Sequence, residues 1–316
     1  MNITMRQLEV FCAIASHGNV TRASEELLLS QSAASMALAE FERWVGQRLF
    51  NRKGRKLLLN EQGQVLWPLA REILTRGNEI EHLFTGPDAR LSGSLRIGAS
   101  STIGNYLIPT FLGEFTRQLP AVELSLEVGN TDHVIRSLLE FKADVGYIEG
   151  LCRHPKIEVR PWRVDQLIIV ASPQHPLARR QRVTLKDLSK QQWILRESGS
   201  GTREIFERSL AVQLDRLDIG FELGNTEAVK QAVRHNLGIT CLSQLTVADD
   251  LIRGSLVQLK TPWLGLQRDL YCLLHRDHYP SRLLQAVVDF FAESARGEGL
   301  CETGQEAPGW SGSRPE

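Results

Sequence analysis

The chain has 316 residues, of which 42% are hydrophobic and 23% are charged, as is typical of a soluble globular protein. Its 37 basic and 37 acidic side chains give a formal net charge of zero, so the overall charge favours no particular partner and any basic binding surface must be local. This length exceeds what one hydrophobic core usually serves, which predicts two or three domains.

The N-terminus and the cysteines favour the cytoplasm. We expect no signal peptide, because MNITMRQLEVF lacks a basic stretch followed by an apolar one. We also expect no membrane partner, because no uncharged apolar run could span a bilayer. The five cysteines are scattered, without a C-x-x-C pair, and fit a reducing compartment and no zinc site: Cys12, Cys152, Cys241, Cys272 and Cys301. Buried or incidental thiols are favoured over redox sensing.

Three helices are predicted before residue 46. The first has apolar residues at helical spacing and ends at Gly18. A short second helix is expected from Thr21 as its N-cap, and Ser30 is expected to cap a third. The third helix has one apolar stripe, which faces a core and consists of Ala34, Leu38, Phe41 and Val45.

The opposite face of the third helix is short and polar near its start, with Gln31, Ser32, Ser35, Met36 and Ala39. Short side chains let a helix approach a surface closely. A helix that enters the DNA major groove reads base edges with its N-terminal residues, and serine and glutamine can hydrogen-bond bases or phosphates. These residues therefore indicate a DNA-contacting helix.

A basic hairpin is predicted directly after this helix. The segment 43–56 contains six basic residues and no acidic one, and 49–59 reads as a strand, a glycine turn and a strand. Such a hairpin beside a recognition helix is typical of a winged helix-turn-helix, whose basic residues neutralise phosphates. The alternative is a solvated basic hairpin on an ordinary helical domain.

The first 63 residues resemble the N-terminal domain of LysR-type transcriptional regulators, and a weaker resemblance extends to about residue 295. It is carried by the Leu8–Phe11 helix, Thr21-x-Ala23, the Ser30-Gln31-Ser32-Ala33 start, Leu49-Phe50-x-Arg52 and Gly63. The resemblance implies that the third helix enters the major groove and that the wing lies along the DNA backbone. We assign DNA contacts to Thr21, Arg22, Ser30, Gln31, Ser32, Ser35, Met36, Arg52, Lys53 and Arg55.

The chain departs from this family at two positions. Met36 stands where the family often has an arginine, so a favoured guanine contact is missing there. Ser24 replaces a common alanine. We expect the fold to survive both changes.

A connecting helix is predicted from a cap at Asn60, with Glu61 near its positive end. Its apolar seam resembles a short coiled coil and comprises Leu66, Leu69, Ile73, Ile80 and Leu83. Pro68 would favour a kink in a helix interior. We expect a dimerisation helix, which the family also implies, rather than a helix packed only on its own domain; a linker should begin at 86–88.

The remaining chain alternates strands with helices, which predicts a mostly parallel sheet. It also contains a repeat. EVGNTDHV at 127–134 matches ELGNTEAV at 222–229, and each copy follows a strand that ends in small polar residues, at 100–102 and 198–202. The domain should therefore consist of two similar α/β halves facing a cleft. This organisation resembles periplasmic binding proteins and the effector domain of the LysR family.

Ligands of open α/β sheets bind beyond the carboxyl ends of the strands, and helix N-termini there suit anions. We therefore expect a small, anionic effector in the cleft, although these residues are also ordinary N-caps. The candidate effector-binding residues are Ser100, Ser101, Thr102, Asn130, Thr131, Ser200, Thr202, Asn225 and Thr226.

The predicted fold class is α/β multidomain: a winged helix-turn-helix (1–60), a linker or dimerisation helix and hinge (61–92), an effector-binding domain (93–296) and a disordered tail (297–316). The effector-binding domain should comprise the halves 93–165 plus 267–296 and 166–266. Its periplasmic-binding-protein-like fold follows from the resemblance.

We predict a regulator whose DNA binding responds to the effector. Its partners are double-stranded DNA, the effector and further copies of the chain in a homodimer and, by family resemblance, a homotetramer; RNA polymerase is a further candidate partner. We expect no catalytic site, metal or cofactor, because the chain has neither a P-loop lysine, a G-x-S-x-G elbow nor metal-ligand histidine spacing. The alternative is a solute-binding or small-acid-processing protein with a helical oligomerisation head.

Overall fold

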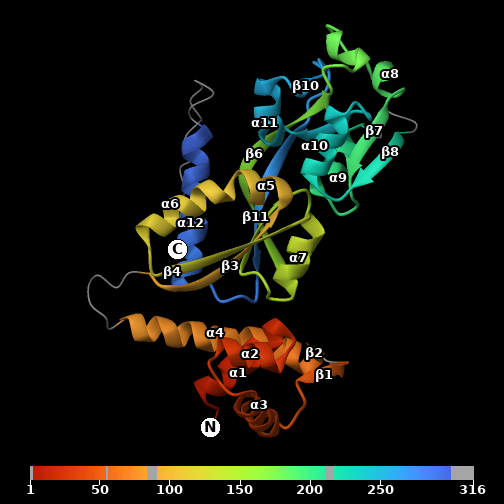
Figure 1. Cartoon of the computed structure of the whole chain (residues 1–316). Coiled ribbons are helices and arrows are strands. Elements are labelled where there is room, and N and C mark those ends of the chain that lie inside the picture. Colours follow the sequence, from red (N-terminus) through yellow and green to blue (C-terminus); the bar gives the residue numbers. More distant parts are fainter. Residues whose placement is uncertain (1–2, 55, 84–90, 211–216, 300–316) are drawn as a thin grey trace.

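The computed structural model describes residues 3–54, 56–83, 91–210 and 217–299. It comprises an N-terminal head, a long connecting helix and a larger domain of two lobes (Figure 1). The head lies on one side of the connecting helix and the lobes lie on the other. Within the described ranges, no helix combines the length and apolar character needed to cross a membrane.

The head packs three helices and a hairpin around one aromatic core. Its elements are α1 (Met5–His17), α2 (Val20–Glu26), α3 (Gln31–Val45), β1 (Phe50–Lys53) and β2 (Lys56–Leu59). The ring of Phe11 lies with its centroid 5.6 Å from those of both Phe41 and Phe50. The hairpin is tied to the end of α1, because the N–H of Leu57 donates to the carbonyl of Gly18 at 2.8 Å. This core sets the position of α3 and the wing.

The predicted caps of the head are partly confirmed. Ser30 caps α3, its hydroxyl oxygen accepting from the N–H of Ala33 at 3.1 Å. The prediction that Thr21 caps α2 is wrong. Asn19 occupies that position with extended backbone, and its amide oxygen accepts from the N–H groups of Thr21 and Arg22 at 2.8 and 3.3 Å. Asn19 was the better candidate because asparagine is at least as good a cap as threonine.

The connecting helix α4 (Glu61–Leu83) runs through Pro68 as a single helix. It begins after Asn60, whose amide oxygen accepts from the N–H of Gly63 at 2.9 Å, as predicted. Trp67 and Ala70 are buried against the head core, and Leu66 packs beside them. Leu66 is therefore not part of the exposed apolar seam that was predicted for this helix. The side chain of Leu83 and the predicted linker start at 86–88 lie outside the described residues.

An exposed apolar stripe, which we call the α4 stripe, runs along the outer face of this helix. Its members are Val65, Leu69, Ile73 and Ile80, with exposed fractions of 69%, 52%, 46% and 56%. The first three are spaced by four residues and the last by seven, which places all four on one face. Val65 therefore takes the place in the exposed seam that was predicted for Leu66.

The first lobe is built on three parallel strands in the order β5 (Val145–Glu149), β3 (Gly93–Ser100) and β4 (Val122–Gly129). Its helices are α5 (Ser101–Tyr106), α6 (Ile108–Gln118), α7 (Thr131–Leu139) and α12 (Arg282–Gly299). One face of the sheet packs against α5, α6 and α12, and the other packs against α7. Helix α12 therefore packs in the first lobe although it comes last along the chain. It extends to Gly299, three residues into the predicted tail; residues 300–316 lie outside the described ranges.

The second lobe is built around the parallel pair β7 (Gln192–Arg196) and β8 (Asp218–Leu223). Its core centres on Trp193, whose ring lies 4.6 Å from that of Phe206 between centroids. The remaining elements complete the lobe: a 3₁₀ helix (Pro176–Arg179), α8 (Leu185–Leu188), α9 (Gly201–Leu210), α10 (Thr226–Arg234), β9 (Thr240–Ser243), α11 (Gln244–Arg253) and β10 (Val257–Gln258).

Two strands, β6 (Ile157–Ala171) and β11 (Gln267–His275), connect the lobes. One carries the chain out and the other carries it back, so they pair antiparallel, with Asp165 opposite Arg268. β9 and β10 also pair antiparallel with β6. The prediction of a mostly parallel sheet is therefore correct for the strands that begin each half and wrong for the crossing strands.

The internal repeat is confirmed as a structural repeat. In each lobe a strand leads through an asparagine N-cap into a helix: β4, Asn130 and α7 in the first, β8, Asn225 and α10 in the second. Each of these strands pairs in parallel with the preceding one, β3 or β7. The carboxyl ends of four strands consequently meet at the junction of the lobes.

Candidate nucleic-acid interface and ligand cleft

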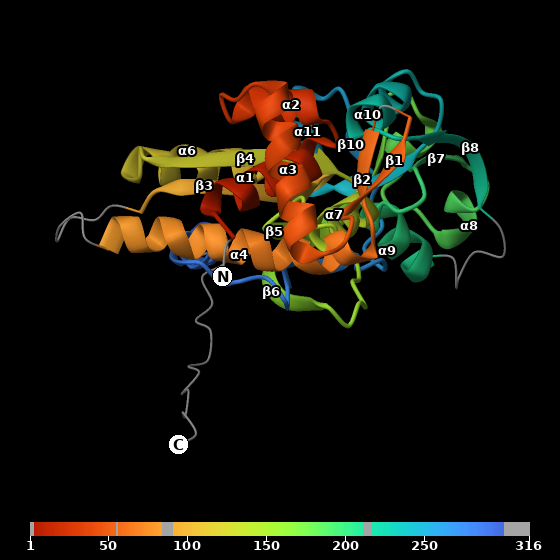
Figure 2. The ribbon, with the colours of Figure 1, turned by 90° about the horizontal axis from the view of Figure 1, so that it is seen from below.

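The exposed face of α3 lies on the side of the head away from the lobes (Figures 1 and 2). All seven of the predicted DNA-contacting residues of α2, α3 and the turn between them are exposed: Thr21, Arg22, Ser30, Gln31, Ser32, Ser35 and Met36. Met36 is 65% exposed although it is apolar. The apolar stripe on the opposite face is turned into the head core, with Ala34, Leu38 and Phe41 buried. Nothing else in the described chain covers the polar face.

The wing lies beside α3 when the molecule is viewed from below (Figure 2). Arg52 and Lys53 are exposed at its tip, next to Gly54, whose φ of 63° lies in the left-handed region that glycine tolerates. Arg55 lies outside the described residues. Short polar side chains on a helix and cations on an adjacent hairpin form a surface that can contact base edges and phosphates at once.

The cleft between the lobes brings together residues from both halves of the repeat. Ser100, Thr102, Thr131, Ser200, Thr202 and Thr226 are all buried there. The sequence suggested hydroxyl groups open to a ligand, but several of them contact other protein groups instead. The hydroxyl of Thr131 donates to the carbonyl of Glu149 at 2.6 Å, and that of Ser100 donates to the Glu149 carboxylate.

Arg268 lies at the centre of this arrangement. Its guanidinium forms an ion pair with Asp165 at 2.6 Å, and both side chains are 1% exposed. It also donates to the hydroxyl of Thr202 at 2.9 Å and to that of Thr102 at 3.5 Å. One buried cation therefore bonds the N-terminal turns of α5 in the first lobe and α9 in the second.

A second arginine, Arg196, spans the cleft nearer its mouth. It is 4% exposed and donates to the hydroxyl of Thr226 at 2.7 Å in its own lobe and to that of Ser101 at 3.3 Å in the other. It also pairs with the carboxylate of Glu197 at 2.8 Å, and the amide of Asn130 donates to the same carboxylate at 3.3 Å. Burial raises the pKa of Glu197, but its bonds to Arg196 outweigh this and hold the pKa below its usual range.

The lobes approach closely because glycines lie at the contact. A Cβ on Gly201 would lie 1.7 Å from the carbonyl oxygen of Glu149, and one on Gly150 would lie 3.0 Å from the Cα of Gly201. The mouth of the cleft opens into a hollow of about 580 Å³, lined by Ser101, Asn105, Asn130, Arg136, Arg196 and Asn225. That volume lies within the range of small-molecule sites.

Several charged cleft residues were missed by sequence reasoning. Glu149 and Arg196 each end a buried strand, at the sheet edge where ligands bind, and this position was a usable signal. Arg268 gave no such signal, because it alternates with the polar neighbours Gln267 and Asp269 on an antiparallel strand. Its role depends on a partner 103 residues away.

The described chain holds its potential metal ligands apart and its cysteines as free thiols. None of its clusters of His, Cys, Asp and Glu could hold a metal ion. Cys12, Cys152, Cys241 and Cys272 are free thiols, and burial raises the pKa of Cys12, Cys241 and Cys272 to about 12. Cysteines react as thiolates. The raised pKa values of these three therefore favour buried or incidental thiols over redox sensing, which is also the interpretation that the sequence favoured.

Comparisons with known proteins agree on both parts of the chain. The family model "Bacterial regulatory helix-turn-helix protein, lysR family" matches residues 5–64, and the model "LysR substrate binding domain" matches residues 88–296. The HTH-type transcriptional regulator YeiE of Escherichia coli K12 is 43% identical over 92% of this chain and 97% of its own. The activator CmpR of Synechocystis is 32% identical over 92% of this chain and 95% of its own.

Solved structures share the architecture. A full-length OxyR variant from Pseudomonas aeruginosa covers 94% of this chain and 95% of its own with a TM-score of 0.75 at 19% identity. The regulatory domain of Synechocystis CcmR, solved in complex with 2-PG, covers 65% of this chain and 98% of its own with a TM-score of 0.61 at 27% identity.

Proposed function

Since the chain belongs to the LysR family of DNA-binding transcriptional regulators with an effector-binding domain, we propose that α3 and the wing form its promoter contact and that the lobe cleft holds a small anionic effector. The observation that supports the DNA contact is the exposed face of α3 beside the basic wing. Short side chains at the helix start allow close approach to base edges, while Arg52 and Lys53 neutralise phosphates.

A charge-reversal experiment tests the DNA contact. DNA ligands are first selected from a random-sequence pool with the wild-type protein, and fluorescence anisotropy then measures their affinity for Ser35→Glu. Ser189→Glu introduces the same charge on the exposed surface of the second lobe and serves as the control. We expect the first variant to lose binding by at least tenfold and the second to bind normally. Equal affinities would reject α3 as the contact.

The effector proposal rests on Arg196. Its guanidinium is desolvated, reaches both lobes and is neutralised by a carboxylate from its own chain, that of Glu197. In our proposal the anionic group of the effector takes the place of the Glu197 carboxylate beside Arg196 and Asn130. The effector then contacts both lobes, and its differential affinity for two lobe arrangements shifts the placement of the heads. The 2-PG complex of the CcmR regulatory domain supports a small-molecule site in such a domain.

The α4 stripe supports a homodimer. Four exposed apolar side chains on one helix face lose their contact with water when a second copy packs against them. Two further surfaces suit additional copies: β4 and β8 end their sheets, and Val128, Ile219 and Phe221 are exposed on them. A self-contact surface on α4 together with the separate edge strands β4 and β8 supports the homotetramer that the sequence suggested. A dimer also matches a two-fold symmetric DNA site.

We further place the protein in the cytoplasm, with the chromosomal DNA that it binds, and assign it regulation rather than catalysis. The alternative of a solute-binding or acid-processing protein with an oligomerisation head requires the polar face of α3 to be a protein contact. The Ser35→Glu experiment separates the two, since only a DNA-binding surface loses DNA affinity with the added negative charge.

A further inference from the structure

A second cavity lies where the head, α4 and the first lobe meet, and we call it the junction cavity. It encloses about 370 Å³, a volume within the range of small-molecule sites. Helices α1 and α2 of the head line one side, and α4, the start of β3 and Asp144 line the other. This cavity is distinct from the lobe cleft, since the two share no lining residue.

The first-lobe wall of the junction cavity carries a charge cluster. Asp144 is buried and accepts from Arg71 Nη2 of α4 at 2.7 Å and from the backbone N–H of Arg96 at 2.8 Å. The two guanidinium groups also donate to one carbonyl, that of Phe141, at 3.0 Å from Arg71 and 2.5 Å from Arg96. Two cations therefore share one carboxylate and one carbonyl, which leaves positive charge at this corner.

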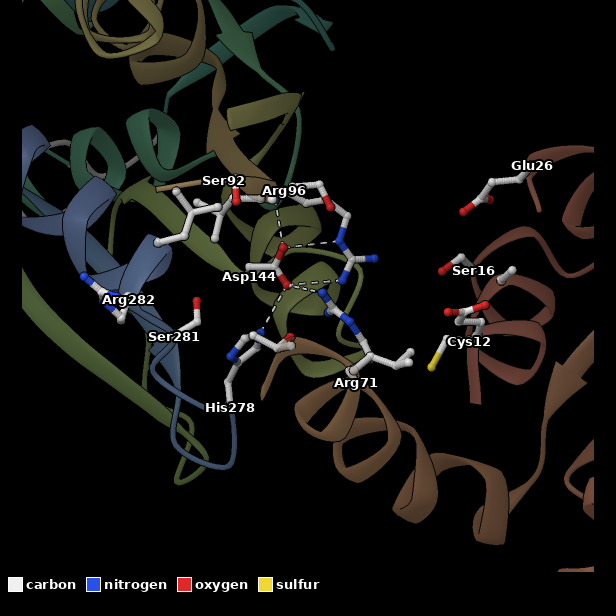
Figure 3. A pocket seen from close by; sticks show the side chains of 18 of the residues that line it. Cys12, Ser16, Glu26, Arg71, Ser92, Arg96, Asp144, His278, Ser281 and Arg282 are labelled. Atoms are coloured by element: carbon white, nitrogen blue, oxygen red, sulfur yellow. Dashed lines mark hydrogen bonds and ion pairs between the residues drawn. The ribbon is translucent and has the colours of Figure 1, made fainter. Parts of the chain in front are cut away.

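Part of the positively charged Arg96 guanidinium faces the cavity. Its Nε and Nη2 bond to Asp144 and Phe141, whereas Nη1 meets no acceptor within the described part of the chain. Figure 3 shows Arg96 and Arg71 on one side of an open space, with Cys12, Ser16 and Glu26 across it. Burial lowers the pKa of Arg96; the charge of Asp144 opposes this shift, and the nearby charge of Arg71 adds to it.

The head wall has the opposite character. Glu9 and Glu26 line it with carboxylates, each of which has one partner within the head, Arg6 at 2.7 Å for Glu9 and His17 for Glu26, and Ser16 adds a hydroxyl. Each carboxylate keeps further lone pairs that can accept from a ligand. A simple anion would meet repulsion from these carboxylates, whereas a ligand with a hydrogen-bond donor at its far end would be attracted to them. The two walls together select an occupant with an anionic end and a donor end.

We infer that the junction cavity is a second ligand site, which binds a small carboxylate bearing a hydroxyl or amino group. The ligand carboxylate accepts from Arg96 Nη1, and its hydroxyl or amino group donates to the carboxylates of Glu9 or Glu26. Such a ligand bridges the DNA-binding head to the first lobe. It would favour the head placement seen here over any placement that opens the junction.

Binding is tested on the full-length chain with five probes: L-serine, L-glutamate, D-glycerate, acetate and inorganic phosphate. Titration calorimetry measures the affinity of each probe for the wild type and for variants of the cavity lining. We expect L-serine, L-glutamate or D-glycerate to bind at least tenfold more tightly than acetate or phosphate. The inference is wrong if no probe binds, or if acetate and phosphate match the other three.

Two variants locate the site independently. Ser16→Leu fills the space from the head wall, and Arg96→Lys keeps the charge but removes the donor that faces the ligand. Each should weaken the binding of the tightest probe at least tenfold, with normal DNA affinity of Ser16→Leu showing that the head is folded. Thr226→Val, in the lobe cleft, should leave the affinity for this probe unchanged. Loss of probe binding in Thr226→Val alone would place the ligand in the cleft and overturn the second site without affecting the proposed function.

Discussion

Arg196 of the second lobe donates from Nη2 to the hydroxyl of Ser101 in the first lobe at 3.3 Å. This bond crosses the cleft and ends at the N-terminal residue of α5, where the helix dipole places positive character. An anion at this point meets a guanidinium and a helix N-terminus together. The nearby carboxylate of Glu197 is the group that such an anion must displace.

The cleft should therefore respond in opposite directions to two neighbouring substitutions. Arg196→Met removes the cation, and because hydrogen bonds to charged groups contribute about 1.5–3 kcal/mol, we expect anion affinity to fall roughly 10- to 100-fold. Glu197→Gln keeps the shape but removes the competing charge, so affinity should rise. Calorimetry with an effector identified by thermal-shift screening measures both. A rise in affinity with Arg196→Met would contradict the assignment of Arg196.

The wing should contribute a salt-dependent share of DNA affinity. Each phosphate contact that is lost reduces the slope of log affinity against log salt by about 0.9. We expect Arg52→Gln and Lys53→Gln each to reduce the slope by roughly that amount, because both side chains are exposed at the hairpin. Anisotropy titrations at several salt concentrations measure the slope. Lys190→Gln, which removes an exposed cation from the second lobe, should leave it unchanged.

Met36 should set part of the sequence preference of α3. It is 65% exposed on the polar face, where an arginine could reach guanine O6 and N7. Met36→Arg should therefore enrich guanine at one position of each half-site, with a gain of about 1–3 kcal/mol for that base. Selection from a random DNA pool with the wild type and the variant reads this directly, and identical selected sequences would show that residue 36 does not face a base.

The α4 stripe should hold two copies together. Ile73→Glu places a charge in an apolar contact, so we expect the dimer to dissociate to monomers at micromolar concentration, as measured by light scattering after size exclusion. Gln64→Glu adds the same charge at an exposed position of α4 outside the stripe and should leave the dimer intact. A dimeric Ile73→Glu protein would move the dimer contact elsewhere.

Asp144 should make stability depend on acid pH. Burial opposes its ionisation, but bonds to His278, Arg71 and Arg96 outweigh this and hold its pKa well below the usual range. A group whose pKa is depressed on folding stabilises the folded state above its unfolded pKa, about 3.9, and loses that contribution as pH falls below it. We expect wild-type unfolding free energy to decline below about pH 4.

Asp144→Asn should remove that part of the acid dependence. At neutral pH it leaves two partly buried guanidinium groups without their counter-charge, and breaking such a pair typically costs about 3–5 kcal/mol. Urea denaturation at pH 7 and pH 3.5 measures the difference, which should be smaller at the lower pH. A constant difference between the two pH values would contradict the low pKa of Asp144.

Local sequence features correctly predicted much of this protein. The caps Ser30 and Asn60, the glycine turn of the wing, the apolar stripe of α3 and the repeated Asn-Thr helix starts are all properties of short segments. Their energies come from residues within one or two helical turns, so periodicity and capping rules are sufficient to find them. The two-lobed fold with strand ends meeting at a cleft follows from the repeat of such units.

The tertiary structure alone decided which charges serve the cleft and the junction. Arg268 meets Asp165 across 103 residues, and Arg71 meets Asp144 across 73. No local pattern marks either arginine, because a charged side chain on a strand or helix reads as solvated until the chain folds back and buries it. The sequence by itself determined the elements and the polar face of α3. Long-range desolvation and pairing, which exist only in the folded chain, determined which charged residues meet in the two candidate sites.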